Sequence, residues 1–199
     1  MSAGAQATLY VDGGAAAVSV LTEPAHFGGS LDDLRSARAS GAATAPLLRK
    51  DFHVDELQLL EARAAGAAAA LLIARALSPD VLRRLVAFAM SIDLEPLVEV
   101  RTTAELERAV ATGARVIGVN NRDLETLKIE PEVGAALLRL VPSDCVAIAE
   151  SGVRGVADVK RAAVSGADAV LVGSSISAAP DPKAAVRALA NVPRSERGG

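Results

Sequence analysis

The amino-acid sequence predicts an α/β fold built on a parallel β-sheet. Short apolar runs alternate with amphipathic segments along the chain, which is the pattern of strands that are each followed by a helix. The runs are apolar at nearly every position, as expected for strands that are buried on both faces. With 199 residues, 51% of them hydrophobic, the chain can form one domain with a substantial core.

Seven strands and the helices between them can be read in order. Ser30 is a suitable N-cap, Pro79 fits the first turn of a helix, and Gly66 and Gly113 are suited to ending helices. The expected strands are residues 15–21, 45–49, 68–73, 96–100, 116–119, 145–149 and 169–172. The expected helices are a segment beginning at Ser30 and residues 55–65, 78–91, 103–112, 131–140, 156–165 and 181–190.

Residues 7–11 are ambiguous. Their composition suits a strand, but they equally suit the last turns of a helix that ends at Gly13 and Gly14. We expect residues 1–190 to form a single domain and residues 191–199 to form a flexible polar tail.

Two sheet architectures compete. A doubly wound sheet usually carries a glycine fingerprint after its first strand, and Gly13–Gly14 and Gly28–Gly29 do not form one. A (β/α)₈ barrel instead places its active site at the carboxyl ends of the strands. Polar residues stand at most of these ends, namely Glu23, Lys50, Glu99, Asn120, Glu150, Ser151 and Ser174. The sequence therefore favours a barrel framework with seven readable strand–helix units.

Composition excludes several classes of function. A net charge of −3 and an aromatic content of 2% argue against a nucleic-acid partner, which needs a basic surface and stacking side chains. The single cysteine, Cys145, excludes an intramolecular disulfide and fits a reducing compartment. Neither a secretion signal nor an apolar run of membrane-spanning length is present. We expect a cytoplasmic protein with no membrane partner, and nothing in the sequence specifies its oligomeric state.

Lys50 is the first candidate for a catalytic group. Only four of the 21 basic residues are lysines, and Lys50 directly follows Arg49 at a strand end. A desolvated lysine can transfer a proton, whereas an arginine cannot. Glu99, Asn120 and Glu150 end other strands and should converge on the same mouth, where an ammonium beside carboxylates can form an acid–base pair. The alternative is that these are solvated or structural rim residues.

Two glycine-containing strand ends near the C-terminus predict a phosphate site. Ser151–Gly152 and Gly173–Ser174 each precede an expected helix, and the last two loops of such barrels usually bind phosphate. The alternative is that both glycines only form tight turns. Arg122 either contacts an anion or pairs with Asp123. His26 and His53 lack the spacing of metal ligands, so no metal site is expected.

Several of these strand ends resemble those of indole-3-glycerol-phosphate synthase. The matching stretches are Leu-Leu-Arg-Lys-Asp-Phe at 47–52, Leu-Val-Glu-Val at 97–100, Ile-Gly-Val-Asn-Asn-Arg-Asp-Leu at 117–124, Ala-Glu-Ser-Gly-Val at 149–153 and Val-Leu-Val-Gly-Ser at 170–174. Residues 18–23 and 27–31 also match, so the resemblance runs from about residue 10 to residue 190.

The resemblance implies a cofactor-free lyase of tryptophan biosynthesis that acts on a phosphorylated small molecule. The reaction closes the ring of 1-(2-carboxyphenylamino)-1-deoxyribulose 5-phosphate with loss of carbon dioxide and water. Lys50 would be the general acid, Glu99 would support the cationic intermediate, Asn120 would orient sugar hydroxyls, and Glu150 would complete the polar network. The resemblance also implies that Ser151, Gly152, Gly173 and Ser174 bind the phosphate and that Phe27, Phe52 and Leu124 pack on the substrate ring.

The N-terminus departs from this family. Its members begin with a helical extension and a first strand reading roughly Glu-x-Lys-x-x-Ser-Pro-Ser, and residues 1–10 do not match it. The resemblance implies that the first βα unit is largely missing and that residues 7–12 end the following helix. We therefore expect impaired activity; the alternatives are a non-catalytic or phosphosugar-binding remnant that needs a partner segment, and an enzyme for another phosphosugar.

Overall fold

A parallel β-sheet forms the centre of the protein. The computed structural model describes residues 1–123 and 125–195, and within them seven strands pair in sequence order, β1-β2-β3-β4-β5-β6-β7. Their bounds are β1 (Val18–Leu21), β2 (Leu47–Lys50), β3 (Ala69–Ile73), β4 (Glu95–Val100), β5 (Val116–Asn120), β6 (Val146–Glu150) and β7 (Ala169–Leu171). All six pairings are parallel, so every strand ends on the same side of the sheet.

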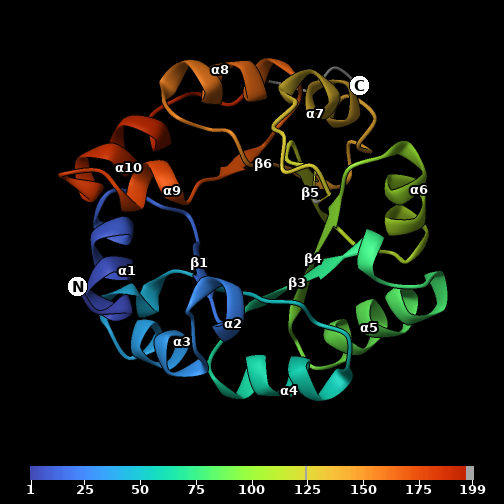
Figure 1. Cartoon of the computed structure of the whole chain (residues 1–199), viewed down its shortest axis with the longest axis horizontal. Coiled ribbons are helices and arrows are strands. Elements are labelled where there is room, and N and C mark those ends of the chain that lie inside the picture. Colours follow the sequence, from blue (N-terminus) through green and yellow to red (C-terminus); the bar gives the residue numbers. More distant parts are fainter. Residues whose placement is uncertain (124, 196–199) are drawn as a thin grey trace.

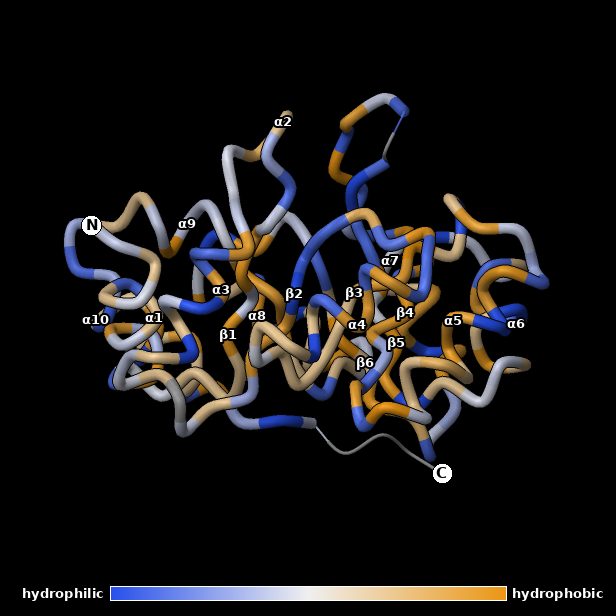
Figure 2. The backbone as a smooth tube through the Cα atoms, turned by 90° about the horizontal axis from the view of Figure 1, so that it is seen from below, coloured by the Kyte–Doolittle hydropathy of each residue, from blue (hydrophilic) through white to orange (hydrophobic). Residues whose placement is uncertain are grey.

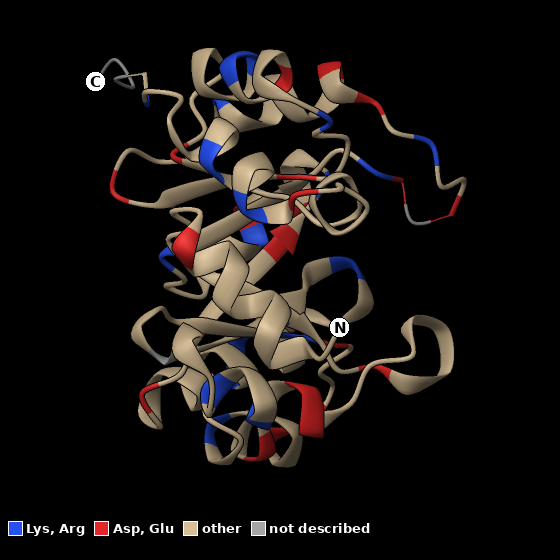
Figure 3. Cartoon of the chain, turned by 90° about the vertical axis from the view of Figure 1, so that its left-hand side faces the viewer, with Lys and Arg blue, Asp and Glu red and all other residues tan. Residues whose placement is uncertain are grey.

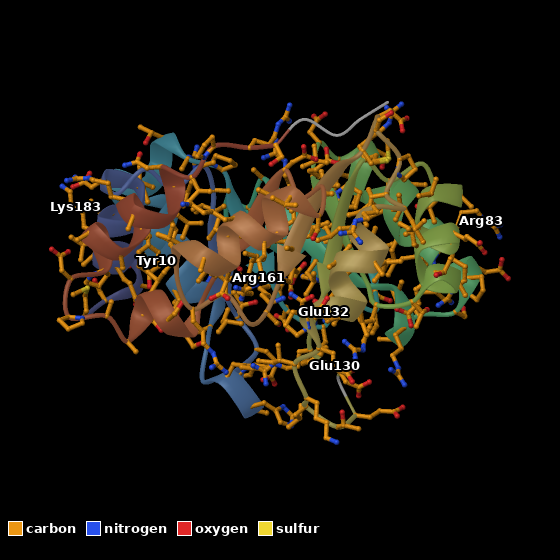
Figure 4. All side chains as sticks on the ribbon, turned by 90° about the horizontal axis from the view of Figure 1, so that it is seen from above. Tyr10, Arg83, Glu130, Glu132, Arg161 and Lys183 are labelled. Atoms are coloured by element: carbon orange, nitrogen blue, oxygen red, sulfur yellow. The ribbon has the colours of Figure 1, made fainter. Side chains whose placement is uncertain are left out.

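Helices surround the sheet on its outer face (Figure 1). The α-helices are α1 (Ala3–Asp12), α2 (Pro24–Phe27), α3 (Leu31–Arg38), α4 (Glu56–Ala64), α5 (Pro79–Ser91), α6 (Thr103–Ala111), α7 (Pro131–Leu138), α8 (Val156–Val164), α9 (Ser174–Ser177) and α10 (Pro182–Ala190), with two 3₁₀ turns, η1 (Gly41–Thr44) and η2 (Ala74–Ala76). The sheet curls so that the first and last helices meet, and Lys183 of α10 pairs with Asp12 of α1 at 3.0 Å. Lys183 and Tyr10 mark these two neighbouring helices in Figure 4.

The curvature separates two hydrophobic clusters. The larger one fills the space between the sheet and the helices, and Leu34, Leu72 and Leu82 are completely buried in it. The smaller one lies on the concave inner face of the sheet and includes Leu48, Leu71, Ile73 and Leu97. Side chains alternate between the two faces of a strand, so Leu48 faces inward and Leu47 outward.

Most of the expected elements are present, with boundaries shifted by a few residues. Ser30 caps α3 by accepting a hydrogen bond from Asp33 N, Pro79 occupies the first turn of α5, and Gly66 follows α4 with φ +96°. The largest shift is in β1, which begins at Val18 rather than at residue 15. The ambiguous residues 7–11 are helical and belong to α1, which packs against α3, η1 and α10. The two short helices α2 and α9 were not expected from the sequence.

The surface shows mixed charge. Figure 3 shows basic and acidic residues interspersed over the helices and loops of the face it presents. Across the described residues, no helix has both the length and the apolar character needed to cross a membrane.

Candidate active site

The centre of the site is one lysine between two carboxylates from distant strands. Lys50 ends β2, and its Nζ lies 3.4 Å from Glu150 Oε2 and 3.5 Å from Glu99 Oε2. The two carboxylate side chains are only 2% and 5% exposed, while the lysine side chain is 25% exposed. The sheet therefore brings together the ends of β2, β4 and β6 and leaves the ammonium as the member of the cluster most open to solvent.

Asn120 completes this polar cluster. Its Nδ2 donates to Glu99 Oε1 at 3.0 Å, and its Oδ1 accepts from the backbone N–H of Arg122 at 2.9 Å. Asn120 also stands opposite Glu150 in the β5–β6 register. The four candidate catalytic residues from the sequence, Lys50, Glu99, Asn120 and Glu150, are thus in one place.

The electrostatics favour a protonated lysine beside a protonated carboxyl. Burial acts to lower the pKa of Lys50, but the charges of Glu150 and Glu99 outweigh burial and raise it. Burial, opposed by the charge of Lys50, raises the pKa of Glu150 to about 7. Below pH 7 a neutral Glu150 carboxyl beside the charged Lys50 lowers the cost of burying the cluster.

Lys50 faces inward because side chains alternate along a strand and the adjacent Arg49 faces outward. Arg49 is 6% exposed on the outer face, where its side chain pairs with Asp51 Oδ2 at 2.9 Å and donates to Gln58 O at 2.7 Å. Asp51 also accepts from the hydroxyl of Thr22 at 2.6 Å, which ties the ends of β1 and β2 together. This buried network fixes the strand end that carries Lys50.

Gly118 is a site residue that the sequence analysis missed. A Cβ built on it would lie 2.0 Å from Glu150 Oε1, so only glycine at this position leaves room for the Glu150 carboxyl. The signal was present in the sequence, because an isolated glycine inside an apolar strand often marks a close approach by another group. Among the described residues, that Oε1 atom is buried without a hydrogen-bond partner.

Arg122 reaches the same region from the loop after β5. It lines a small cavity together with Glu99 and Asn120. One of the two alternatives for Arg122 was an ion pair with Asp123. In the structure Asp123 Oδ2 instead pairs with Arg101 Nε at 3.3 Å, and Arg122 Nη1 donates to Leu127 O at 3.3 Å. Arg122 is therefore placed at the mouth beside the carboxylate cluster, where anion contact remains a prediction.

The two glycine-containing loops expected to bind phosphate lie next to each other. Ser175, the second residue of α9, donates from its Oγ to Val153 O at 2.9 Å, which joins the start of α9 to the loop after β6. Ser151 and Gly152 both have positive φ, +66° and +82°, so the backbone turns sharply there. Gly173 precedes α9, and a Cβ built on it would meet no heavy atom within 4 Å. The space beside Gly173 is therefore open.

Two of the three ring-packing candidates are in contact. Phe27 ends α2, Phe52 follows β2, and their ring centroids are 6.5 Å apart with an interplanar angle of 37°. Both remain about half exposed, at 55% and 47%, so they offer an apolar surface. Leu124, the third candidate, lies outside the described residues. Figure 2 shows α2 and the loop between β5 and α7 projecting from the same side of the sheet.

Comparisons with known proteins agree on one family. Residues 1–189 match the family model described as indole-3-glycerol phosphate synthase. A protein of that name from Dehalococcoides mccartyi is 47% identical over 184 residues, which cover 92% of this chain and 71% of the relative. Another, from a Nocardioides species, is 52% identical over 183 residues and covers 92% of this chain and 70% of the relative.

Solved structures agree on the fold. A 3-hexulose-6-phosphate synthase matches with a TM-score of 0.80 at 17% identity, over 94% of this chain and 91% of the other. A thiamine phosphate pyrophosphorylase from Pyrococcus furiosus matches with a TM-score of 0.71 at 16% identity, over 94% of this chain and 86% of the other. At these identities the likeness concerns the fold alone.

Proposed function

The chain belongs to the indole-3-glycerol phosphate synthase family, and from this premise we propose that it closes the ring of 1-(2-carboxyphenylamino)-1-deoxyribulose 5-phosphate to form indole-3-glycerol phosphate. The observation that carries the proposal is the Lys50 ammonium, held within 3.5 Å of both Glu99 and Glu150 at the mouth of the sheet. A lysine whose pKa is raised is protonated at neutral pH and suited to donate a proton rather than to accept one.

The chemistry follows from this arrangement. The ring carbon that bears the carboxylate attacks the ribulose carbonyl carbon, and Lys50 protonates the carbonyl oxygen as it becomes a hydroxyl. Carbon dioxide leaves, and the electrons of the broken C–C bond restore the aromatic ring. The new hydroxyl then leaves as water after a second protonation, while the Glu99 carboxylate stabilises the cationic intermediate. Loss of a proton from the methylene carbon beside the ring nitrogen forms the last double bond and completes the indole. Asn120 orients the sugar hydroxyls, and Glu150 completes the polar network around Lys50.

Substrate binding is assigned to the surrounding loops. The backbone of Ser151–Gly152 and Gly173–Ser174 would hold the phosphate, since the two loops adjoin and the space beside Gly173 is open. The exposed Phe27–Phe52 pair would pack on the aromatic ring, with Leu124 as the third contact. Arg122 would contact the ring carboxylate. No cofactor is required for any of these steps.

We further propose that the sheet represents a (β/α)₈ framework whose first βα unit is largely absent from residues 1–190, which form one domain. In the described residues β1 and β7 are the edges of the sheet, although the helices beside them, α1 and α10, are in contact. This observation also favours a second candidate function: a non-catalytic or phosphosugar-binding protein that needs a partner segment at the open edges. Either version would act in the cytoplasm.

The proposal is tested by incubating the purified 199-residue chain with the substrate and measuring the fluorescence of the product. We expect indole-3-glycerol phosphate to form more slowly than with the Nocardioides relative measured in parallel, because the first strand implied by the family resemblance carries a further glutamate and lysine. Turnover at the rate of the relative would contradict the expected impairment. Tight binding of the substrate without any product would instead support the second candidate.

A further inference from the structure

Arg101 lies beside the site but is not among the candidate residues. It directly follows β4, two residues after Glu99, and its side chain is only 10% exposed. Its backbone N–H donates to Glu105 Oε2 at 2.7 Å, and Glu105 also forms the capping box of α6 with Thr102. The backbone of Arg101 is therefore held by two rigid elements, β4 and α6.

The guanidinium of Arg101 reaches across to three points of one segment. Its Nη1 donates to Asn120 O at 3.3 Å, its Nε pairs with Asp123 Oδ2 at 3.3 Å, and its Nη2 pairs with Glu130 Oε2. Glu130, labelled in Figure 4, lies where the loop after β5 joins α7. The three acceptors thus come from the end of β5, the start of the loop and the end of the loop.

The loop itself is a short antiparallel hairpin, which we call the β5 hairpin (residues 121–123 and 125–130). Arg122 forms an antiparallel bridge with Ile129, and Asp123 N donates to Lys128 O at 2.8 Å. At the base, Glu130 N donates to Asn121 O at 2.8 Å. Arg101 therefore contacts both arms of the β5 hairpin near its base.

The base of the β5 hairpin determines how two site residues are presented. The side-chain amide of Asn120 is held between the backbone N–H of Arg122 and the carboxylate of Glu99. A shift of the backbone at residues 120–122 would lengthen the first of these bonds and so release the amide. Arg101 also lines the same small cavity as Glu99, Asn120 and Arg122.

We propose that Arg101 is a positioning residue, which holds the β5 hairpin against β4 so that Asn120 and Arg122 face the substrate. This inference rests on the proposed function, since it assigns substrate contact to those two residues. An arginine is required because its planar fork of donors contacts three separate acceptors at once, whereas a lysine presents a single compact charge. Arg101 itself touches no reacting atom and transfers no proton.

Hydrogen exchange measured by mass spectrometry tests whether Arg101 holds the β5 hairpin in place, and it does not require turnover. Arg101→Met should make the amides of the β5 hairpin exchange roughly 10-fold faster while the rest of the sheet is unchanged. Arg115→Met is the control, because Arg115 lies at the opposite end of β5, where it pairs with Asp144 at 3.4 Å. Unchanged exchange of the β5 hairpin in Arg101→Met overturns the proposal, whether or not the chain turns over substrate.

Steady-state kinetics test whether Arg101 affects catalysis through Asn120 and Arg122. Arg101→Met should lower kcat roughly 10- to 100-fold, as expected when site groups are displaced, and Arg101→Lys should restore only a small part of it. In a background that carries Asn120→Ala and Arg122→Ala, the same change should cost less than about 2-fold, because its targets are gone. Equal losses in both backgrounds overturn the proposal, since a purely structural role would produce them. Absence of turnover in the unmodified chain contradicts the proposed function alone, and the exchange result then decides the role of Arg101.

Discussion

Lys50 Nζ lies 3.4 Å from Glu150 Oε2, although 100 residues separate the two in the sequence. Each is the last residue of its strand, β2 or β6, and in a parallel sheet all such ends share one side. Curvature of the sheet brings these two ends across the concave face to each other. The ion pair is therefore a direct consequence of strand polarity combined with sheet curvature.

Replacing Lys50 should remove the proton donor. Lys50→Met is expected to lower kcat by roughly 10²- to 10⁴-fold, the range typical of a lost general acid. Lys160→Met changes an exposed lysine on α8 and should leave the rate unaltered. Product formation by Lys50→Met within a few-fold of the parent chain, measured by fluorescence, would show that another group protonates the carbonyl.

Glu150 should make the protein less stable as the pH rises. Its pKa is raised to about 7 in the folded state, chiefly by burial, against an ordinary value of 4.5 in the unfolded chain. The folded state therefore holds an extra proton between these values, and its stabilisation, fully present below pH 4.5, is lost as the pH rises through 7. The loss is about 3 kcal/mol. Because His53 opposes this change, the decrease should be measured by urea unfolding at pH 5 and pH 8 in a His53→Gln background. Adding Glu150→Gln to that background should abolish the decrease, whereas adding the exposed change Glu132→Gln should retain it.

His53 should produce the opposite pH dependence. It is 3% exposed, its Nδ1 lies 2.7 Å from Leu71 O, and burial lowers its pKa to about 4. The unfolded chain takes up the proton near 6.5, so stability is complete above that pH and falls by about 3 kcal/mol as the pH decreases to 4. This pH dependence of stability is opposite to that caused by Glu150, and the two overlap in pH. The free energy of unfolding of the parent chain should therefore change little with pH. His53→Gln should unmask the Glu150 slope, and a profile that stays flat would contradict both assignments; His26→Gln is the exposed control.

Gly173→Ala should separate phosphate binding from folding. A methyl group there meets no heavy atom within 4 Å, so the unfolding midpoint should not change. If phosphate occupies that space, the methyl group should weaken the binding of inorganic phosphate roughly 10-fold by excluding the anion from the backbone. Gly155→Ala is a matched control, since Gly155 also precedes a helix and also has open space around it. Equal affinities of the two variants for inorganic phosphate, measured by calorimetry, would show that Gly173 is not part of the phosphate site.

The Arg49–Asp51 pair should contribute strongly to stability. Both side chains are at most 10% exposed. Removing Asp51 leaves the buried Arg49 with Glu61 as its remaining ion-pair partner, at 3.4 Å and 55% exposed, so its charge is poorly compensated. Asp51→Ala should therefore lower the free energy of unfolding by about 3 kcal/mol. The double variant Arg49→Met with Asp51→Leu should be less destabilised than Asp51→Ala alone. Urea titration at pH 7 measures both, and a double variant at least as unstable as Asp51→Ala would show that the loss comes from packing instead.

Much of the local structure could be predicted from the sequence. Ser30, Pro79, Gly66 and Gly113 stand at or next to helix ends, because helix ends and turns depend on the hydrogen bonding and φ preferences of single residues. The residue at the end of each apolar run can also be read from the sequence. For this reason Lys50, Glu99, Asn120 and Glu150 could be predicted to lie together. The phosphate loops could be predicted from their glycines and from their place before the last two helices. The packing of Phe27, Phe52 and Leu124 on the substrate ring came only from the family resemblance.

Other features depend on contacts between distant segments. Residues 7–11 suit a strand or a helix, and they form α1 in contact with α3, η1 and α10. Gly118 acquires its role only when β6 lies beside β5, because the Glu150 carboxyl then fills the space where a Cβ would be. The reach of Arg101 to Glu130 likewise depends on how β4 and the β5 hairpin are placed.

The sequence by itself determined the alternation of strands and helices, the direction of every strand end and the set of polar residues carried there, because periodicity and capping act over a few neighbouring residues. Only the tertiary structure decided the curvature that places Lys50 between Glu99 and Glu150, the space that Gly118 leaves for a carboxyl, and the outward network around Arg49. These depend on packing free energy summed over segments up to 100 residues apart, which no local pattern encodes.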